Sequence, residues 1–322
     1  MQHWDGLGNL SERLRMPRLP TAMMLRPVRL TLPGALLLVA TPLLAQDAAI
    51  APVDAARVRA QEMIDRVVEN QKKNEQALDI YERIEKVEVR KAGSDAQPLS
   101  VKISRVIPAG TGVGKIPVRP DGQAVDDAAY RAELGKIVKA LTWAVEDGRA
   151  QREAYEKISK KKKEREVLID ATRRAFLYTF ASEERRGDVL LSKYRMEPNP
   201  GFKPTSRVET VFTRVRGYVW VEESSRQLAR VEGDVTEDIS VGLFLGKIYK
   251  GSHFMQERYE IEPGLWLPTF LQYDFDGRKL FSSFAIHERT FYSNYRLIGP
   301  PKEALVALRA ELGKPASTAA DP

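Results

Sequence analysis

The stretch Gly217–Gly233, GYVWVEESSRQLARVEG, decides the fold of this 322-residue chain. Its first part, Tyr218–Glu222, is rich in aromatic and β-branched residues, which favour a packed strand. The polar segment Glu223–Arg226 follows, and Leu228–Glu232 then alternates apolar and charged residues. Two strand-like runs around a short polar connection predict a β-hairpin.

Similar runs continue on both sides of this hairpin, and turns rich in Gly, Pro, Asn and Asp separate most of them. The predicted strands are Tyr81–Arg90, Leu99–Ile107, Phe176–Ala181, Val189–Glu197, Val208–Arg216, Tyr218–Glu222, Leu228–Val235, Leu243–Tyr249, Phe254–Glu260, Trp266–Phe275, Lys279–Arg289 and Phe291–Arg296. Consecutive short strands with short turns predict an antiparallel sheet that is curved or closed.

Four segments have the apolar spacing of helices: Pro52–Ala77, Asp126–Val145, Ala150–Arg174 and Pro300–Leu312. The middle two are joined at Gly148 and predict a helical hairpin, inserted at residues 124–174. The predicted fold class is therefore α+β: a large curved antiparallel sheet, an open half-barrel, covered by the N- and C-terminal helices.

The N-terminal residues 1–45 have the features of a secretory signal peptide. Basic residues precede the apolar run Leu30–Leu44, which ends at the small residue Ala45. The run is shorter than the roughly 20 residues that a membrane-spanning helix needs. We therefore expect export to the periplasm or beyond, with cleavage near Ala45. The mature chain is expected to form one domain, 46–313, followed by a disordered tail, 314–322.

Composition excludes several function classes. The chain has no cysteine, which rules out a cysteine nucleophile, a thiolate metal site and a lipid-modified cysteine. Its net charge is +7. Residues 1–45 hold five Arg and two acids, so the mature part has 46 bases and 42 acids, a net charge of +4. That excess is too small to predict nucleic-acid binding.

The motifs that could carry chemistry have simpler explanations. Gly110–Gly114 resembles a fragment of a phosphate-binding loop, but Pro117 and Pro120 follow it, so we expect a flexible connection within Pro108–Gly122. Asp274–Gly277 lacks the later ligands of a calcium loop, and its Asp-Gly pair predicts a hairpin turn. No motif calls for a metal or a cofactor.

Two histidines remain in the mature chain, His253 and His287. Neither belongs to a His-Glu-x-x-His pattern, and any triad partner would have to come from elsewhere in the fold. The apolar neighbours of His287 along its strand favour a packed or cavity-lining side chain. No catalytic residue is therefore assigned.

The lysines Lys160–Lys163 have two interpretations. They could contact anionic lipid head groups. Acids at helical spacing, in the pairs Glu153–Lys157 and Glu156–Lys160, instead favour a solvated, salt-bridged helix face, and Lys160–Glu166 is expected to project into solvent.

Aromatic residues give the only candidate site. On the predicted strands, Leu271, Tyr273 and Phe275 share one face while Phe270 points to the other, so apolar side chains occur on both faces of the sheet. A second apolar face must meet a helix, another sheet or a ligand. The candidate groove residues are Trp220, Phe244, Phe254, Trp266, Phe270, Tyr273, Phe281 and Phe284, with the helices 54–77 and 300–312 as lids.

This layout resembles the outer-membrane lipoprotein-sorting (LolA/LolB-like) superfamily of periplasmic carriers. The resemblance covers Tyr81–Ser100 and Phe176–Arg296. Its motif residues are Gly217, Trp220, Val221, Leu228, Arg230, Val231 and Glu232 in the hairpin, and the strand start Leu265–Pro268. Members fold as an open curved sheet closed by helices, hold acyl chains in the interior and are not enzymes. The helical hairpin departs from that pattern.

Three functions remain in order of preference. The first is a non-enzymatic carrier or binding protein that holds a lipid or a lipidated segment in a hydrophobic groove. The second is an envelope interaction protein that docks a partner protein through residues 124–174. The third is an envelope hydrolase that uses His253 or His287.

Overall fold

The structure is a computed structural model that describes residues 52–91, 97–110, 112–206, 208–241, 246–279 and 282–314. All of these residues fall in one compact unit, Pro52–Pro322. The predicted signal peptide, the candidate residues Phe244 and Phe281, and the tail from residue 315 onward lie outside the described residues. The prediction of a single mature domain, 46–313, stays a prediction.

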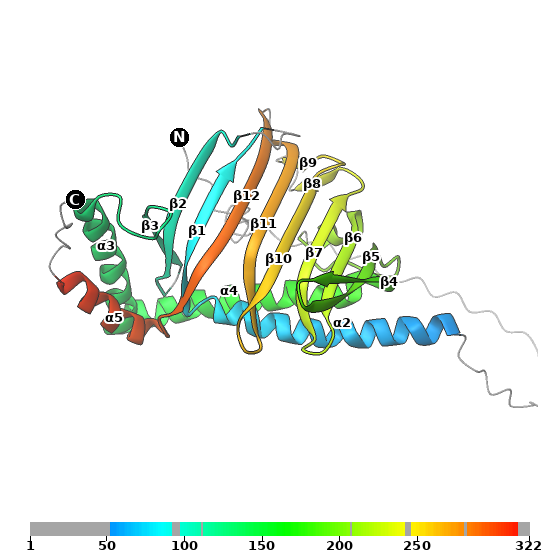
Figure 1. Ribbon diagram of the computed structural model, residues 1–322, viewed down its shortest axis with the longest axis horizontal. Coiled ribbons are helices and arrows are strands. Elements are labelled where there is room, and N and C mark those ends of the chain that lie inside the picture. The colour runs from blue at the N-terminus through cyan, green and yellow to red at the C-terminus, as the bar shows by residue number, and fades with distance from the viewer. Residues whose placement is uncertain are drawn as a thin grey trace, which may run out of the picture. The chain divides into compact units, whose positions relative to one another are not determined.

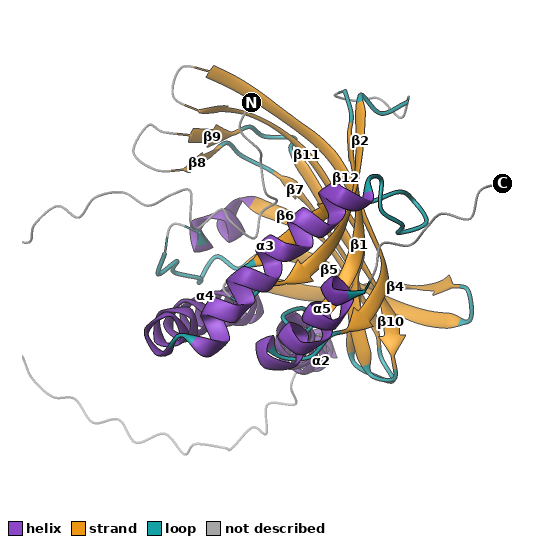
Figure 2. Cartoon of the chain, turned by 90° about the vertical axis from the view of Figure 1, so that its left-hand side faces the viewer, coloured by secondary structure: helices purple, strands orange, loops and turns teal. Residues whose placement is uncertain are grey.

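The described strands form one open antiparallel sheet, in the order β3-β2-β1-β12-β11-β10-β7-β6-β5-β4 (Figure 1). Two short strands, β8 and β9, pair with each other beside β11. The strands are β1 Tyr81–Val89, β2 Ser100–Pro108, β3 Val113–Pro117, β4 Phe176–Arg186, β5 Val189–Pro198, β6 Val215–Glu222, β7 Gln227–Val235, β8 Ile239–Val241, β9 Gly246–Ile248, β10 His253–Glu262, β11 Leu265–Lys279 and β12 Ser282–Leu297. The sheet is curved (Figure 2), so the predicted α+β class is confirmed.

The helices are α2 Pro52–Ala77, α3 Asp127–Glu146, α4 Gly148–Ala175 and α5 Pro301–Gly313. Asp147 joins α3 to α4, and its side chain caps α4 by accepting bonds from the amides of Arg149 and Ala150. The two arms then separate: α3 packs on α5 and α4 packs on α2. In Figure 1, α2 and α4 run across one end of the strands, whereas α3 and α5 lie beside β3.

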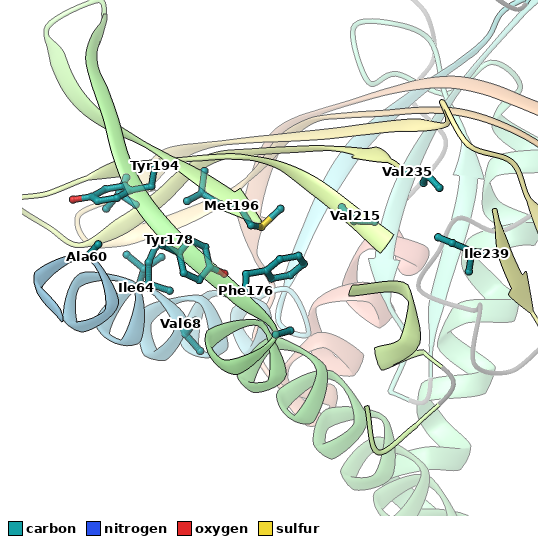
Figure 3. Close-up of a cluster of buried hydrophobic side chains, with 14 residues drawn as sticks. Ala60, Ile64, Val68, Phe176, Tyr178, Tyr194, Met196, Val215, Val235 and Ile239 are labelled. Carbon is teal, nitrogen blue, oxygen red and sulfur yellow. The ribbon is translucent and has the colours of Figure 1, made fainter. Parts of the chain in front are cut away.

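Two hydrophobic clusters hold these helices to opposite ends of the sheet. In the first, Ala60, Ile64 and Val68 of α2 pack against side chains of β4 to β7 such as Phe176 and Tyr194 (Figure 3). In the second, α3 and α5 pack against Ile107 and Ile116 of β2 and β3. A binding site on the sheet is therefore expected on the strands between the two clusters.

The hairpin from Gly217 to Gly233 forms as predicted. Gly217 lies directly opposite Gly233, and the paired strands end at Glu222 and Gln227. The side chain of Glu222 accepts bonds from the amides of Ser224 and Ser225, which closes the connection. Local sequence was sufficient here because both strands and their turn lie within 17 residues of one another.

Three local predictions were wrong. Most of the predicted strand Val208–Arg216 is instead a 3₁₀ helix, Glu209–Arg214, at whose start the buried Glu209 carboxylate accepts bonds from the amide and hydroxyl of Thr205. The Asp276-Gly277 pair is not a turn, because β11 continues to Lys279. Part of the expected flexible connection, Val113–Pro117, pairs with β2 as β3. At these last two places pairing with a neighbouring strand overrides local turn propensity: Val113–Pro117 forms a hairpin with β2, and Gly277 pairs with Phe284 and Ile248.

Lys160–Glu166, the charged middle of α4, was expected to project into solvent. Only part of it does so. Arg165 donates to the Asp79 carboxylate at 2.9 Å, and Glu166 accepts a bond from Gln76 at 2.8 Å, so both contact the end of α2. Lys160 and Lys163 are exposed. The helix therefore has a paired side facing α2 and an open side.

Buried polar contacts fix α2 on the sheet. The side chain of Arg258, which is 1% exposed, donates to Glu75 of α2 and to the carbonyl oxygen of Trp266. The buried Asn74 donates to Gln227 at 2.8 Å. A buried ion pair is costly to break because each charge would lose its only compensation. These contacts hold α2 against the sheet, and its role as a lid stays a prediction.

Candidate ligand-binding face

The central strands β10, β11 and β12 carry a row of apolar side chains on one face. In the register, Tyr273 lies between Phe254 of β10 and Glu288 of β12, and Phe275 lies opposite Ile286. Directly opposite residues point to the same face of a sheet. We call this set the inner row: Phe254, Leu271, Tyr273, Phe275, Phe284, Ile286 and Tyr292.

The inner row lies on the same face of the sheet that α2 covers at its other end. Val231, which packs in the α2 cluster, is opposite Gln256, and Gln256 is opposite Leu271. Every member of the row is half-buried. Phe254 packs against the α2 cluster, but the other six belong to none of the hydrophobic clusters formed by the described residues. The row is therefore an ordered apolar surface that the described helices leave partly uncovered.

Two glycines allow phenyl rings of the row to lie against the sheet. A Cβ atom at Gly233 would sit 2.6 Å from the ring of Phe254, and one at Gly277 would sit 2.5 Å from the ring of Phe284. Gly277 is opposite Phe284 in the register. The Asp-Gly pair that suggested a turn thus has another role, since its glycine gives room to a ring from the neighbouring strand.

One end of the inner row is polar. Glu85 of β1 lies opposite Tyr292 and accepts a bond from Lys115 of β3 at 2.5 Å. The hydroxyls of Tyr273 and Tyr292 have no hydrogen-bond partner among the described residues. Burial raises the pKa of both phenols, so both stay protonated at neutral pH. The face therefore has an apolar end, at Phe275 and Phe284, and a hydrogen-bonding end.

Glu288 lies within the row, and its carboxyl has a raised pKa. Burial raises the pKa of its carboxyl above the ordinary value of 4.5, and the nearby Glu85 carboxylate adds to the effect. A bond from Thr290, at 3.2 Å, and the charge of Lys115 oppose the shift. An acid in this position favours the folded state when protonated and disfavours it when ionised.

Replacing Glu288 by glutamine is expected to stabilise the protein in a pH-dependent way. The pKa of Glu288 is raised by folding, so its stabilising effect is present below pH 4.5 and is lost as the pH rises through the folded value. Thermal unfolding of wild type and Glu288→Gln should therefore give similar Tm values at pH 4 and a higher Tm for the variant at pH 8. A Tm difference that is equal at both pH values would contradict this assignment.

Trp220 and Trp266 lie away from the inner row. Trp220 is adjacent to the α2-facing Val219 on its strand and so points to the opposite face. Its indole nitrogen donates to Glu184 at 2.7 Å, and Lys193 and Arg230 lie 4.7 Å from its ring. Both tryptophans are at most 4% exposed and share a small cluster with Leu191 and Ala229. The nearby β4–β5 hairpin supplies Glu184 and Lys193, which only the tertiary structure could show.

Phe270 also lies on the face opposite to the inner row. It is next to Leu271 on β11 and lies opposite Phe291 of β12, with ring centroids 5.0 Å apart. The structure thus brings together Phe254, Tyr273 and Phe284 from the candidate set and separates them from Trp220, Trp266 and Phe270. A groove role for each of these residues stays a prediction.

The two histidines lie on this opposite face as well. His253 Nδ1 is 2.8 Å from the carboxylate of Asp234. His287 has Asp274 3.1 Å from Nδ1 and Asp276 3.3 Å from Nε2. Within the described ranges no serine hydroxyl bonds to either ring, and no group of three or more His, Asp or Glu side chains could hold a metal ion. Strand alternation alone could place Asp274 and Asp276 on one face, but not His287 between them.

The chain is similar to known proteins among solved structures alone. No family model and no curated protein matches the sequence. Among solved structures, the chain is similar to a DUF1329 family protein from Desulfovibrio piger ATCC 29098, at 9% identity and a TM-score of 0.31, over 74% of this chain and 92% of that one. A LolA superfamily protein from Nitrosomonas europaea matches at 10% identity and a TM-score of 0.29, over 76% and 96%.

A third solved structure, an outer membrane lipoprotein-sorting protein domain from Vibrio parahaemolyticus, matches at 9% identity and a TM-score of 0.30, over 76% of this chain and 99% of that one. At these scores we draw no functional conclusion from the three matches. None of the described helices is both long and apolar enough to cross a membrane.

Proposed function

We propose that this protein is an exported, non-enzymatic carrier that holds the acyl chain of a lipid or of a lipidated segment against the inner row. One observation carries the proposal: six ordered apolar side chains on the central strands lie outside every hydrophobic cluster of the described residues. A contiguous apolar surface that remains partly accessible marks a binding site more often than an isolated apolar residue does.

The driving force would be burial of apolar surface, at about 25 cal/mol per Å² or about 0.8 kcal/mol per methylene. Tyr273 and Phe275, with ring centroids 5.3 Å apart, would form the floor beneath the chain. Phe254 and Phe284 would flank it from the neighbouring strands. The hydroxyls of Tyr273 and Tyr292 would donate to oxygens at the polar end of the ligand.

Export to the periplasm is part of the same proposal and is supported by the signal-peptide pattern of residues 1–45. N-terminal sequencing of the protein recovered from a periplasmic fraction tests it. A mature N-terminus close to residue 46 supports export. Recovery of the intact N-terminus from the cytoplasm contradicts it.

Replacing Phe275 by serine is expected to weaken binding of a fluorescent fatty acid such as parinaric acid by about tenfold. This corresponds to losing roughly 55 Å² of apolar contact at about 25 cal/mol per Å². The matched control is Phe270→Ser, because Phe270 is on the same strand and is also half-buried but points to the opposite face. Titrations should give Kd values that rise for Phe275→Ser and stay near wild type for Phe270→Ser.

Two results would reject the carrier function. One is equal Kd values for wild type and both variants, with all three folded by circular dichroism. The other is the absence of any lipid after solvent extraction of the purified protein, combined with no binding of the fluorescent probe.

A further inference from the structure

The basic excess of the chain is concentrated in one helix. α4 contains ten Lys and Arg and five Asp and Glu, a net charge of +5. Residues 46–322 contain 46 bases and 42 acids, so the remainder outside α4 holds 36 bases and 37 acids and has a net charge of −1. The positive charge of the mature chain is therefore a local property of α4.

The bases of α4 divide into two groups by their contacts. Arg173 bonds to Glu69 of α2, and Arg165 bonds to Asp79 in the turn that follows α2. Lys157, Lys160 and Lys163 are exposed and make no ion pair with any described residue. The predicted pairs Glu153–Lys157 and Glu156–Lys160 do not form among the described residues, and Glu153 instead accepts a bond from Arg149 at 3.2 Å.

Two exposed aromatic residues belong to the same helical hairpin, α3 and α4. Trp143, at the end of α3, is 66% exposed, and Tyr155, on α4, is 72% exposed. The other two described tryptophans, Trp220 and Trp266, are at most 4% exposed. A shallow hollow of about 290 Å³ is lined by Gln151, Arg152, Tyr155 and Glu156. Nothing in the packing of the sheet requires these aromatic side chains to be exposed.

We propose that the exposed side of α4, with Trp143 beside its start, docks on the surface of an anionic lipid bilayer. Unpaired lysines are attracted to anionic head groups, and Trp and Tyr are the residues that favour the interface between water and lipid. Both features occur on the same segment, and charge complementarity selects an anionic bilayer over a neutral one. The docking is independent of whether the inner row holds an acyl chain.

The test is sedimentation of the full chain with large vesicles, either phosphatidylcholine alone or an equal mixture with phosphatidylglycerol. We expect binding only to the mixed vesicles, and its loss as NaCl rises from 0.05 to 0.5 M, because the screening length falls to a few ångström. The variant Lys157→Gln/Lys160→Gln/Lys163→Gln should bind on the order of 100-fold more weakly, at about 1 kcal/mol per basic residue.

The matched control is Lys102→Gln/Lys203→Gln/Lys250→Gln, which removes the same charge from three exposed lysines outside α4. It should bind as wild type does. All variants share residues 1–51, so any contribution of that segment is common to them. Trp143→Ala should weaken binding to the mixed vesicles at 0.05 M NaCl. Equal losses in the two triple variants, or binding to both vesicle types alike, would overturn the proposal. Binding to neither type would also overturn it and leave this surface to a protein partner.

Discussion

Replacing Glu75 by alanine is expected to destabilise the protein by about 3–5 kcal/mol, the usual effect of removing one partner of a buried ion pair. The side chain of Arg258 is 1% exposed, whereas that of Glu75 is 20% exposed. Among the described residues, the guanidinium would then keep only neutral partners, the carbonyl oxygen of Trp266 and the side chain of Gln256. Removing Glu75 removes the negative charge beside the Arg258 guanidinium, and those two neutral acceptors cannot replace it.

Urea unfolding followed by circular dichroism measures this effect. The control is Glu69→Ala, because Glu69 is also an acid of α2 paired with a base but its side chain is 55% exposed. Exposed pairs contribute at most about 1 kcal/mol. The double variant Glu75→Leu/Arg258→Met should recover most of the loss, since it leaves no unpaired charge. Equal destabilisation by Glu75→Ala and Glu69→Ala would show that the buried pair does not anchor α2.

Replacing Gly217 by alanine is the second large effect that we expect. A Cβ atom there would lie 2.0 Å from the carbonyl oxygen of Glu232 and 2.7 Å from the Cα atom of Gly233. Both obstacles are backbone atoms of the paired strand, so no side-chain rotation relieves the clash. We expect a loss of about 3 kcal/mol or more, at the upper end of overpacking costs.

Gly135→Ala provides the contrast. Gly135 lies in α3, and a Cβ atom at this position meets nothing within 4 Å. Alanine in a helix interior should stabilise by about 1 kcal/mol. Urea midpoints should therefore move in opposite directions for Gly217→Ala and Gly135→Ala. A Gly217→Ala midpoint near that of wild type would mean that the two strands do not approach as closely as described.

Much of the architecture follows from local sequence. The apolar spacing of Pro52–Ala77 matches α2, and the aromatic and β-branched runs became strands with boundaries shifted by a few residues. Alternation along β11 correctly placed Leu271, Tyr273 and Phe275 on one face and Phe270 on the other. These patterns have periods of about 2 and 3.6 residues, so a short window is enough to detect them.

The candidate site could be predicted only in part. Aromatic content picked out Trp220 and Phe254 equally, yet the structure puts Phe254 in the inner row and Trp220 between Lys193 and Arg230 on the opposite face. Tyr292 of the inner row was missed, although its alternation with Phe291 was a signal that could have suggested it.

By itself, the sequence determined the elements of this protein: its helices, its antiparallel strands and the hairpin between Gly217 and Gly233. Only the tertiary structure decided which faces of these helices and strands pack against one another. Gly277 gives room to the ring of Phe284, Arg258 pairs with Glu75 on a distant helix, and three lysines of α4, Lys157, Lys160 and Lys163, are exposed. The reason is physical. Local patterns fix which way a side chain points within its element, whereas register, twist and helix placement depend on packing between residues far apart in the chain.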